Sequence, residues 1–405
     1  MKVLFVHQNF PGQFSGFVER LADDPDYSLA GIGTRAFTHP RVLYRAYNSP
    51  AASEQPDLLQ REAASRIDRA QSVAAQARLL RLNGFTPDVI IAHSGWSEAL
   101  FLRDIYPEAR IICYCEYYYQ REHGDIGFDP EFPLQSLDIL HRLRIRNAFE
   151  LASIDDADLC ICPTEWQRST YPQALQSRMH VIHEGVDHNV LAEIGPAVGN
   201  AYARKLGIAP GVPVVTYVAR YLEPQRGFHV FMRALPRFQE LSPEAHVVIV
   251  GSEQGGYGQV PESGKTWKDA LLQEHEGRID LTRVHFTGRL TYREYAAILR
   301  RSDIHVYLTY PFVLSWSALE SMAMGKAIVA SGTAPVTEFM EHDKNARLVD
   351  FFQPDALAET MAELMREPEV RRRLGRAARR TIARHDLSRD VAFEKLKALL
   401  KTTAG

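Results

Sequence analysis

Long hydrophobic runs, cysteine and an excess of charge of one sign are all scarce in this chain of 405 residues. No window approaches the roughly 20 apolar residues that a membrane-spanning helix needs. Lys and Arg number 47 against 50 Asp and Glu, and the resulting formal net charge of -3 argues against nucleic acid as a partner. The N-terminal apolar run ends at His7, too early for a signal-peptide core. We therefore expect a soluble, cytoplasmic globular protein.

The four cysteines form two Cys-x-Cys pairs, Cys113 with Cys115 and Cys160 with Cys162, inside apolar runs typical of strands. Because alternate residues of a strand share a face, each pair is expected to point to one side of a sheet. Zinc sites use other spacings. The pattern favours buried free thiols in a reducing compartment over metal or redox chemistry, so no metal site is predicted.

What the sequence does contain is an alternation of short β-branched runs with longer helical patterns, which predicts an α/β protein of parallel β/α units. A helix is expected over 61–82, before the run at 88–93. Gly and Pro gather between Asn189 and Gly211, where we expect the connection between two domains. The predicted strands lie at 2–7, 28–34, 88–93, 109–115, 158–164 and 180–187, and at 213–220, 245–251, 283–288, 304–310, 326–332 and 346–350.

Open parallel sheets bind ligands beyond the carboxyl ends of their strands, so two such sheets suggest a site in the cleft between them. In the second half, Arg220 ends a predicted strand, and Arg226 and Gly227 precede an apolar helix. Arginine suits phosphate oxygens, and a glycine lets backbone amides at a helix N-terminus approach an anion. This pattern favours a diphosphate ligand; two solvated surface arginines beside a turn are the alternative.

Residues 218–227 resemble the Gly-Arg-x5-Lys-Gly segment of retaining family 4 glycosyltransferases (glycosyl transferases group 1) of GT-B fold, with Arg226 in place of Lys. Residues 304–331 resemble the Glu-x7-Glu nucleotide-sugar signature of that family. Glu320 matches the second, ribose-binding Glu, whereas Phe312 occupies the position of the first. The chain thus resembles a subgroup that lacks the first Glu. A helix-terminal acid that complements the helix dipole is the plainer interpretation of Glu320.

Further donor-binding residues follow from the resemblance or from their place near a helix N-terminus. Gly288 resembles the strand-ending Gly of the family, which lines the nucleobase with the two residues after it; an ordinary β-to-α turn is the alternative. Gly12 lies in the first strand-to-helix loop, where it could approach the diphosphate. The remaining predicted donor-binding residues are Arg289, Leu290, Ser315, Trp316 and Ser317.

The resemblance implies two facing Rossmann-like domains, 1–190 on the acceptor side and 191–385 for the nucleotide-sugar, with a C-terminal helix in 386–405 that crosses back to the first. It also implies retaining, metal-independent transfer of a hexose-type sugar from a nucleoside diphosphate to an acceptor hydroxyl of a polysaccharide, glycolipid or metabolite. The nucleotide-sugar is then a co-substrate, and no cofactor is expected. Two alternatives stay open: a catalytically silent nucleotide-sugar-binding subunit of a transferase complex, and an epimerase acting on a nucleotide-sugar.

Catalytic candidates in the first half are His93 and Glu116, both at the ends of predicted strands. Strand-end polar groups held by loop amides are the alternative for each. Tyr114, Tyr117, Tyr118 and Tyr119 suggest either sugar stacking or core and rim packing. Two charged sets are also open to a plainer interpretation: Asp155, Asp156 and Asp158 as a helix-to-strand turn rather than a metal motif, and Arg61, Arg66, Arg69, Arg78 and Arg81 as a solvated helix face rather than a contact with the inner membrane surface.

Overall fold

The computed structural model describes residues 1–405 except 49–56, 135, 257, 259, 262–263 and 402–405. The chain divides into two compact units. Unit 1 comprises Met1–Gly127, Pro133–Gly185 and Arg389–Gly405, and unit 2 comprises Phe128–Phe132 and Val186–Ser388. Among the described residues, no helix is both long and apolar enough to cross a membrane.

Unit 1 contains a seven-stranded parallel sheet of order β3-β2-β1-β4-β5-β6-β7. Its strands are β1 Lys2–Val6, β2 Ser28–Gly33, β3 Val42–Ala46, β4 Val89–His93, β5 Arg110–Tyr114, β6 Leu159–Cys162 and β7 Met179–Val181. Its helices are η1 Gly12–Phe14, α1 Ser15–Asp23, α2 Leu58–Leu82, α3 Leu102–Ile105, α4 Leu137–Asp155, α5 Glu165–Thr170, α6 Gln173–Gln176 and α16 Arg389–Lys401.

Both faces of this sheet are buried, as the central strand β1 illustrates. Val3 and Phe5 pack in the core cluster that includes α1 and α16, whereas Leu4 and Val6 pack in the cluster that includes α2. Successive side chains of a strand point to opposite faces, so a strand covered on both sides is apolar throughout. All four cysteines are free and buried in the α2-side cluster, so each pair shares a face as predicted.

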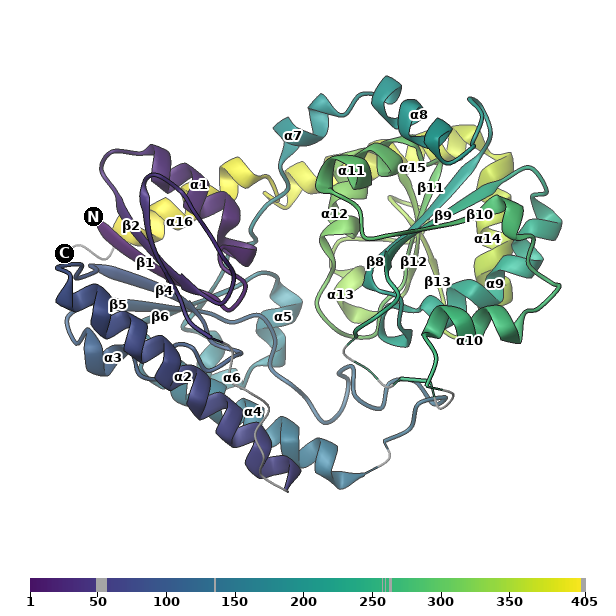
Figure 1. Ribbon diagram of the computed structural model, residues 1–405. Helices are drawn as coiled ribbons and strands as arrows, with labels where there is room; N and C mark the ends of the chain where they lie inside the picture. Colours follow the sequence, from purple (N-terminus) through teal and green to yellow (C-terminus); the bar gives the residue numbers. More distant parts are fainter. Residues whose placement is uncertain (49–56, 135, 257, 259, 262–263, 402–405) are drawn as a thin grey trace. The chain divides into compact units, whose positions relative to one another are not determined.

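Unit 2 contains a six-stranded parallel sheet of order β10-β9-β8-β11-β12-β13, again with helices on both faces (Figure 1). Its strands are β8 Val214–Tyr221, β9 His246–Ser252, β10 Val284–Gly288, β11 Ile304–Tyr307, β12 Ala327–Ser331 and β13 Arg347–Val349. Its helices are α7 His188–Glu193, α8 Pro196–Lys205, η2 Pro224–Arg226, α9 Phe228–Leu241, α10 Trp267–Glu274, η3 Leu281–Arg283, α11 Tyr292–Arg301, α12 Trp316–Ala323, α13 Ala334–Thr337, α14 Pro354–Arg366 and α15 Pro368–Arg384.

The prediction that Asn189–Gly211 connects the two domains is wrong. Most of this segment is helical, and it belongs to unit 2, whose longer stretch begins at Val186. Gly195 and Pro196 mark the start of α8, where proline at the first helical position is well tolerated. At Gly199 a β-carbon would lie 2.9 Å from the carbonyl oxygen of Ala297, so the glycine allows α8 to pack closely on α11. The glycines and prolines here serve helix ends and helix packing.

The predicted return of the C-terminal helix is confirmed. Phe393, Leu396 and Leu400 of α16 pack into the core cluster of unit 1 that contains β1 and α1. Lys397 Nζ donates to Asp24 Oδ2 at 2.8 Å, and Arg20 of α1 pairs with Asp390. In Figure 1 the yellow α16 lies beside the purple α1.

Candidate functional site

In unit 2 the strand order reverses between β8 and β11, which are hydrogen-bonded neighbours. The chain continues from β8 through α9 to β9 on one side, and from β11 through α12 to β12 on the other. Ligands of doubly wound sheets bind at the carboxyl ends of the two strands that flank such a reversal. Arg226 and Gly227 follow β8, and the Ser315–Glu320 segment follows β11, so the sheet brings these predicted residues to one edge.

Gly227 fits the loop after β8 because of two constraints. Its φ angle is 69°, in the left-handed region, and a β-carbon would lie 2.4 Å from Leu308 Cβ. The hydroxyl of Tyr217 donates to the Arg226 carbonyl oxygen at 2.6 Å, which fixes the loop from the core side. Only glycine combines that backbone conformation with such close contact, so α9 starts directly beneath the edge of the sheet.

The Arg226 side chain connects the loops that follow the two strands. Its Nη1 donates to Thr309 Oγ1 at 3.0 Å and to the Val313 carbonyl oxygen at 2.9 Å. The guanidinium lies over the buried Phe312 ring, 5.4 Å from its centroid. Phe312, at the position of the first motif Glu, therefore presents an aromatic face to the Arg226 cation. Unlike a glutamate at this position, the ring does not neutralise the positive charge of Arg226.

Arg220 and Arg289 share a different aromatic residue. Their guanidinium groups lie 5.4 and 5.5 Å from the centroid of the Tyr221 ring. Arg220 belongs to β8 and Arg289 follows β10, with Gly288 before it at a φ of 66°. A β-carbon at Gly288 would meet no atom within 4 Å, so its left-handed turn, rather than crowding, favours glycine there. Leu290 packs against the core cluster of unit 2.

Glu320 is buried, and tyrosine hydroxyls already contact both of its carboxylate oxygens. Tyr292 donates to Oε1 at 2.8 Å, and Tyr295 donates to Oε2 at 2.6 Å. Burial and the Glu320 charge raise the pKa of Tyr295 well above its ordinary value. A carboxylate has about four lone-pair positions, so a ribose hydroxyl would share or replace these donors. The tyrosines carry no sequence signal of this role beyond their place on the helix after Gly288.

The predicted phosphate-facing amides of 315–317 are partly used within the protein. Ser315 N donates to the Tyr307 hydroxyl at 2.7 Å, and Ser317 N donates to Ser315 Oγ at 3.3 Å. Ser315 is the N-cap of α12, and Trp316 is 42% exposed. A phosphate at this helix start would compete with the cap for the Ser317 amide.

In unit 1 the strand order reverses between β1 and β4. His93 ends β4, and Glu116 comes two residues after β5. The structure brings these two candidates into contact, with His93 Nε2 3.3 Å from Glu116 Oε2. Gln13, in η1 after β1, donates from Nε2 to Glu116 Oε1 at 2.8 Å, and Gln167 Nε2 donates to the Glu116 carbonyl oxygen at 2.6 Å. The His93–Glu116 pair thus lies at the carboxyl edge of the sheet.

The charges of this pair support each other. Burial by itself lowers the pKa of His93, but the hydrogen bond to Glu116 together with the charges of Glu116, Glu98 and Glu150 outweighs it, so the pKa is raised. Burial raises the pKa of Glu116, but the hydrogen bond from His93, the charge of His93 and the hydrogen bond from Gln13 together outweigh it, so the pKa is lowered. The His93 side chain is 2% exposed and that of Glu116 28%, so the carboxylate is the part of the pair that meets solvent.

His7 completes this cluster. It follows β1, and its ring lies 5.2 Å from that of His93. Burial, reinforced by His93, lowers the pKa of His7 to about 3, so its imidazole is neutral at physiological pH. A β-carbon at Gly12 would lie 2.5 Å from His7 Cε1, so the predicted donor-binding glycine also makes room for this ring. The same strand-end position that indicated His93 also applied to His7, which the sequence prediction missed.

Two further acids surround His93 and were not predicted. Glu98 accepts from the Tyr47 hydroxyl at 2.5 Å, and Glu150 accepts from Ser94 Oγ at 2.8 Å. Both carboxyl groups are buried, and burial raises the pKa of each. Neither residue ends a strand, so periodicity offered no signal for them.

The charged sets have mostly structural roles. Asp158 Oδ2 accepts from Ile111 N at 2.8 Å in the turn between α4 and β6, as the plainer interpretation predicted. Arg66 contradicts both interpretations of the α2 arginines, because it is 4% exposed and its Nε donates to Glu62 Oε1 at 3.0 Å. Arg61, Arg78 and Arg81 are exposed, and Arg81 also donates to the Ile105 carbonyl oxygen at 2.5 Å.

Within the part of the chain that the structure describes, one group has the arrangement of metal ligands: Asp129, Glu131 and His229 in unit 2. Asp129 Oδ2 lies 3.0 Å from His229 Nε2 and accepts from the Tyr310 hydroxyl at 2.7 Å. Arg233 donates to both oxygens of Glu131, at 2.6 and 2.8 Å. A cation here would have to displace these donors, so the group is better described as a hydrogen-bonded cluster that contains the Arg233–Glu131 ion pair.

The comparisons with known proteins agree with this geometry. Residues 28–191 match the model described as "Glycosyl transferase family 4 group", and residues 200–381 match "Glycosyl transferases group 1". The D-inositol 3-phosphate glycosyltransferase of Corynebacterium efficiens is 24% identical over 58% of this chain and 54% of that protein. The alpha-maltose-1-phosphate synthase of Mycolicibacterium smegmatis is 24% identical over 63% of this chain and 66% of that protein. The chain spans a little over half the length of the first of these relatives.

Solved structures share the fold over nearly the whole chain. Anabaena Alr3699/HepE in complex with UDP-glucose superimposes with a TM-score of 0.72 at 16% identity, covering 99% of this chain and 100% of that one. Sucrose-phosphate synthase from Thermosynechococcus elongatus gives a TM-score of 0.73 at 14% identity, covering 99% and 98%. The predicted fold class, two Rossmann-like parallel sheets of the GT-B type, is confirmed.

Proposed function

Because the chain belongs to the family 4 glycosyltransferases, with a group 1 domain over residues 200–381, we propose that it transfers a hexose-type sugar from a nucleoside diphosphate to an acceptor hydroxyl. The proposed transfer retains the configuration at the anomeric carbon and needs no metal ion. The main support is the placement of Arg226 with Gly227 and of Glu320 after β8 and β11, the two strands that flank the reversal of the unit 2 sheet.

Each of these residues has a chemical task in the proposed reaction. The guanidinium of Arg226 and the N-terminal amides of α9 bind the diphosphate, and the Glu320 carboxylate accepts hydrogen bonds from the ribose. As the bond from the sugar to the diphosphate breaks, negative charge develops on the leaving oxygen. A fixed guanidinium stabilises that charge without reorganising, which is the task that a divalent cation would otherwise perform.

The residues of unit 1 would orient the reacting hydroxyls. A charged His93–Glu116 pair offers a carboxylate acceptor, and hydroxyl groups of a sugar are donors that suit it. The acceptor hydroxyl attacks the sugar on the face from which the diphosphate leaves, so positioning supplies much of the rate enhancement. Polysaccharide, glycolipid and metabolite acceptors all fit this scheme.

The first test is calorimetric titration of the protein with UDP, GDP, ADP and dTDP, with and without EDTA. We expect one nucleotide to bind equally well in EDTA. Replacing Arg226 by Ala should weaken it about 10-fold or more, since a hydrogen bond to a charged group contributes roughly 1.5–3 kcal/mol. Glu320→Gln should also weaken it. Arg237→Ala is the matched control, because Arg237 is an exposed arginine of α9 that pairs with Glu240 and Glu359.

The second test is turnover. The nucleotide-sugar of the best nucleotide is incubated with the protein and candidate acceptors, and the anomeric configuration of the product is read by proton NMR. Retention of configuration is expected. If no nucleotide binds, the assignment of unit 2 is wrong. If a nucleotide binds but neither transfer nor hydrolysis occurs, a silent nucleotide-sugar-binding subunit becomes the better account.

A further inference from the structure

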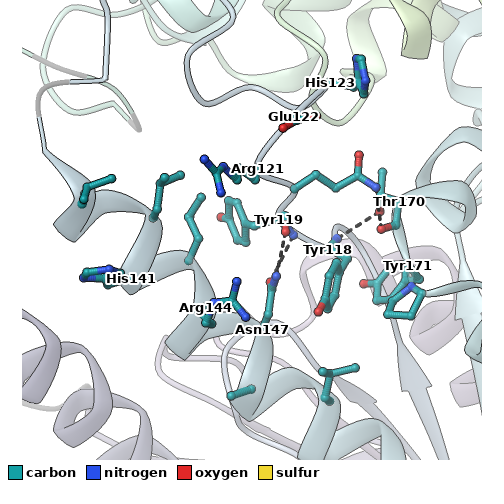
Figure 2. Close-up of a pocket in the computed structure, with 17 residues that line it drawn as sticks. Tyr118, Tyr119, Arg121, Glu122, His123, His141, Arg144, Asn147, Thr170 and Tyr171 are labelled. Carbon is teal, nitrogen blue, oxygen red and sulfur yellow. Dashed lines mark hydrogen bonds between the residues drawn. The ribbon is translucent and has the colours of Figure 1, made fainter.

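Unit 1 contains a cavity of about 760 Å³ whose lining residues have not been assigned a role. It lies between α4, the segment 118–123 that follows Glu116, and residues 170–172 at the end of α5 (Figure 2). Its size is that of a small-molecule site. Tyr118 and Tyr119, which the sequence singled out as sugar-stacking candidates, line it together with Tyr171.

One stripe of α4 faces this cavity. The lining residues Leu137, Leu140, Arg144, Asn147 and Leu151 recur at intervals of three or four, which places them on one side of the helix. Three of these residues are leucines, and apolar residues at such a spacing normally pack against the protein core. Here Leu137 is 64% exposed, so at least one of the leucines meets solvent instead.

The arginines of α4 divide into two kinds. Arg142 Nη2 and Arg146 Nε donate to Glu62 of α2, each at 3.1 Å, and these pairs are part of the packing of the two helices. Arg144, between them in sequence, is exposed and lines the cavity, as does Arg121 of the segment 118–123 (Figure 2). Among the described residues, the structure records no hydrogen bond or ion pair from the guanidinium of Arg121 or Arg144. Two exposed arginines therefore line the cavity without a carboxylate partner among the described residues, and Glu122 lines it as well, at the edge farther from α4.

Hydrogen bonds fix the wall that carries the tyrosines. Asn147 accepts from Tyr119 N at 3.2 Å and donates to the Tyr119 carbonyl oxygen at 2.7 Å. Gln120 Nε2 donates to the Thr170 carbonyl oxygen at 2.9 Å. A wall held in this way loses little conformational entropy when a ligand binds. Because Gln167 of α5 also holds the Glu116 carbonyl, the same helix supports the cavity and the catalytic candidate.

We infer that this cavity binds a phosphate monoester that is joined to an apolar or ring-shaped body. The phosphate pairs with Arg121 and Arg144, and the body packs on the leucines of α4 and on Tyr118 and Tyr171. On the further premise that the proposed transferase function is correct, this ligand is the acceptor. Its phosphate comes either from a soluble phosphorylated metabolite or from a lipid phosphate, since both present the same anion.

Calorimetric titration with two soluble probes, glucose 6-phosphate and decyl phosphate, and with decyl maltoside as an uncharged probe, tests this inference. We expect decyl phosphate to bind and decyl maltoside to bind at least about 10-fold more weakly, because only the phosphate forms charge-assisted hydrogen bonds with the two guanidinium groups. Arg121→Ala combined with Arg144→Ala should abolish the difference between the two decyl probes. Arg78→Ala, an exposed arginine of α2 outside the cavity, is the matched control and should leave binding unchanged.

The two sources of phosphate give different results. Glucose 6-phosphate that binds as tightly as decyl phosphate indicates a soluble acceptor. Binding of decyl phosphate alone, with sedimentation on phosphatidylcholine vesicles only when they contain phosphatidic acid, indicates a lipid phosphate. Equal binding of the charged and uncharged probes, or equal loss in Arg78→Ala, overturns the inference. Titration of every variant with UDP runs in parallel, so failure of the nucleotide site is distinguishable from failure of this cavity.

Discussion

At the scale of single residues, Gly227 separates the cost of backbone conformation from the cost of crowding. Gly227→Ala should lower the free energy of unfolding by more than about 2 kcal/mol, because a left-handed backbone and a clash with Leu308 act together. Gly207 has a φ of 78° but nothing within 4 Å of its β-carbon position, so Gly207→Ala should cost only about 1 kcal/mol. Urea unfolding measures both, and equal costs would show that Leu308 moves freely.

The His93–Glu116 pair predicts a pH window. The raised pKa of His93 stabilises the fold below its ordinary value of 6.5, and this is lost as pH rises through the folded value. The lowered pKa of Glu116 stabilises the fold above its ordinary value of 4.5, and this is lost as pH falls. Between pH 4.5 and 6.5 the free energy of unfolding of the unsubstituted protein should therefore exceed that of the Glu116→Gln variant by about 1–2 kcal/mol. The difference should be smaller at lower and at higher pH. A difference that does not vary with pH would contradict a charged pair.

At the scale of elements, α16 contributes to unit 1 although it lies at the end of the chain. Leu396 is 1% exposed in the core cluster with β1, so Leu396→Ala should cost about 2–5 kcal/mol. Glu394→Ala, on the exposed side of the same helix, should cost less than about 0.5 kcal/mol. Hydrogen exchange followed by mass spectrometry should show the lost protection in β1 and α1 and not in unit 2.

The sequence predicted elements according to how completely they are buried. Twelve strands were predicted, and the signal is clearest for β1, β4 and β12, whose residues are almost all buried. The edge strand β3, Val42–Ala46, was missed because only Val42 is fully buried and Arg45 interrupts the apolar pattern. Helix α8 was predicted to be part of a connection because the segment contains Gly and Pro. In the structure Gly199 allows close packing on α11, a contact that no local pattern reveals.

At the scale of the whole molecule, each compact unit is built from separate stretches of the chain. Phe128–Phe132 belongs to unit 2 although both of its flanks belong to unit 1. Asp129 is 2% exposed and pairs with His229 and Tyr310. Burial raises the pKa of its carboxyl group, but the hydrogen bonds with these two partners help to outweigh burial, so the pKa is lowered. This short segment is therefore anchored to unit 2 through the buried Asp129.

Asp129→Ala should consequently destabilise unit 2 and not unit 1. Removing Asp129 leaves the buried His229 imidazole and the Tyr310 hydroxyl without this hydrogen-bond acceptor, which costs about 1–3 kcal/mol for each unsatisfied group. Hydrogen exchange should show the loss in α9 and β11. Glu131→Ala is the control: Glu131 pairs with Arg233 but its side chain is 41% exposed, so the change should cost at most about 1 kcal/mol. Lost protection in β1 or β4 would contradict this assignment.

By itself, the sequence determined the two parallel sheets and the short segments at their strand ends, because apolar periodicity and glycine conformation are local properties. It also marked Arg226, Gly227 and Glu320, although their roles as ligand contacts remain predictions. Only the tertiary structure decided that Phe312 lies under Arg226, that two tyrosines hold Glu320, and that Asp129 packs in unit 2. These contacts join residues far apart in the chain, and their energies depend on burial and distance, which no local pattern contains.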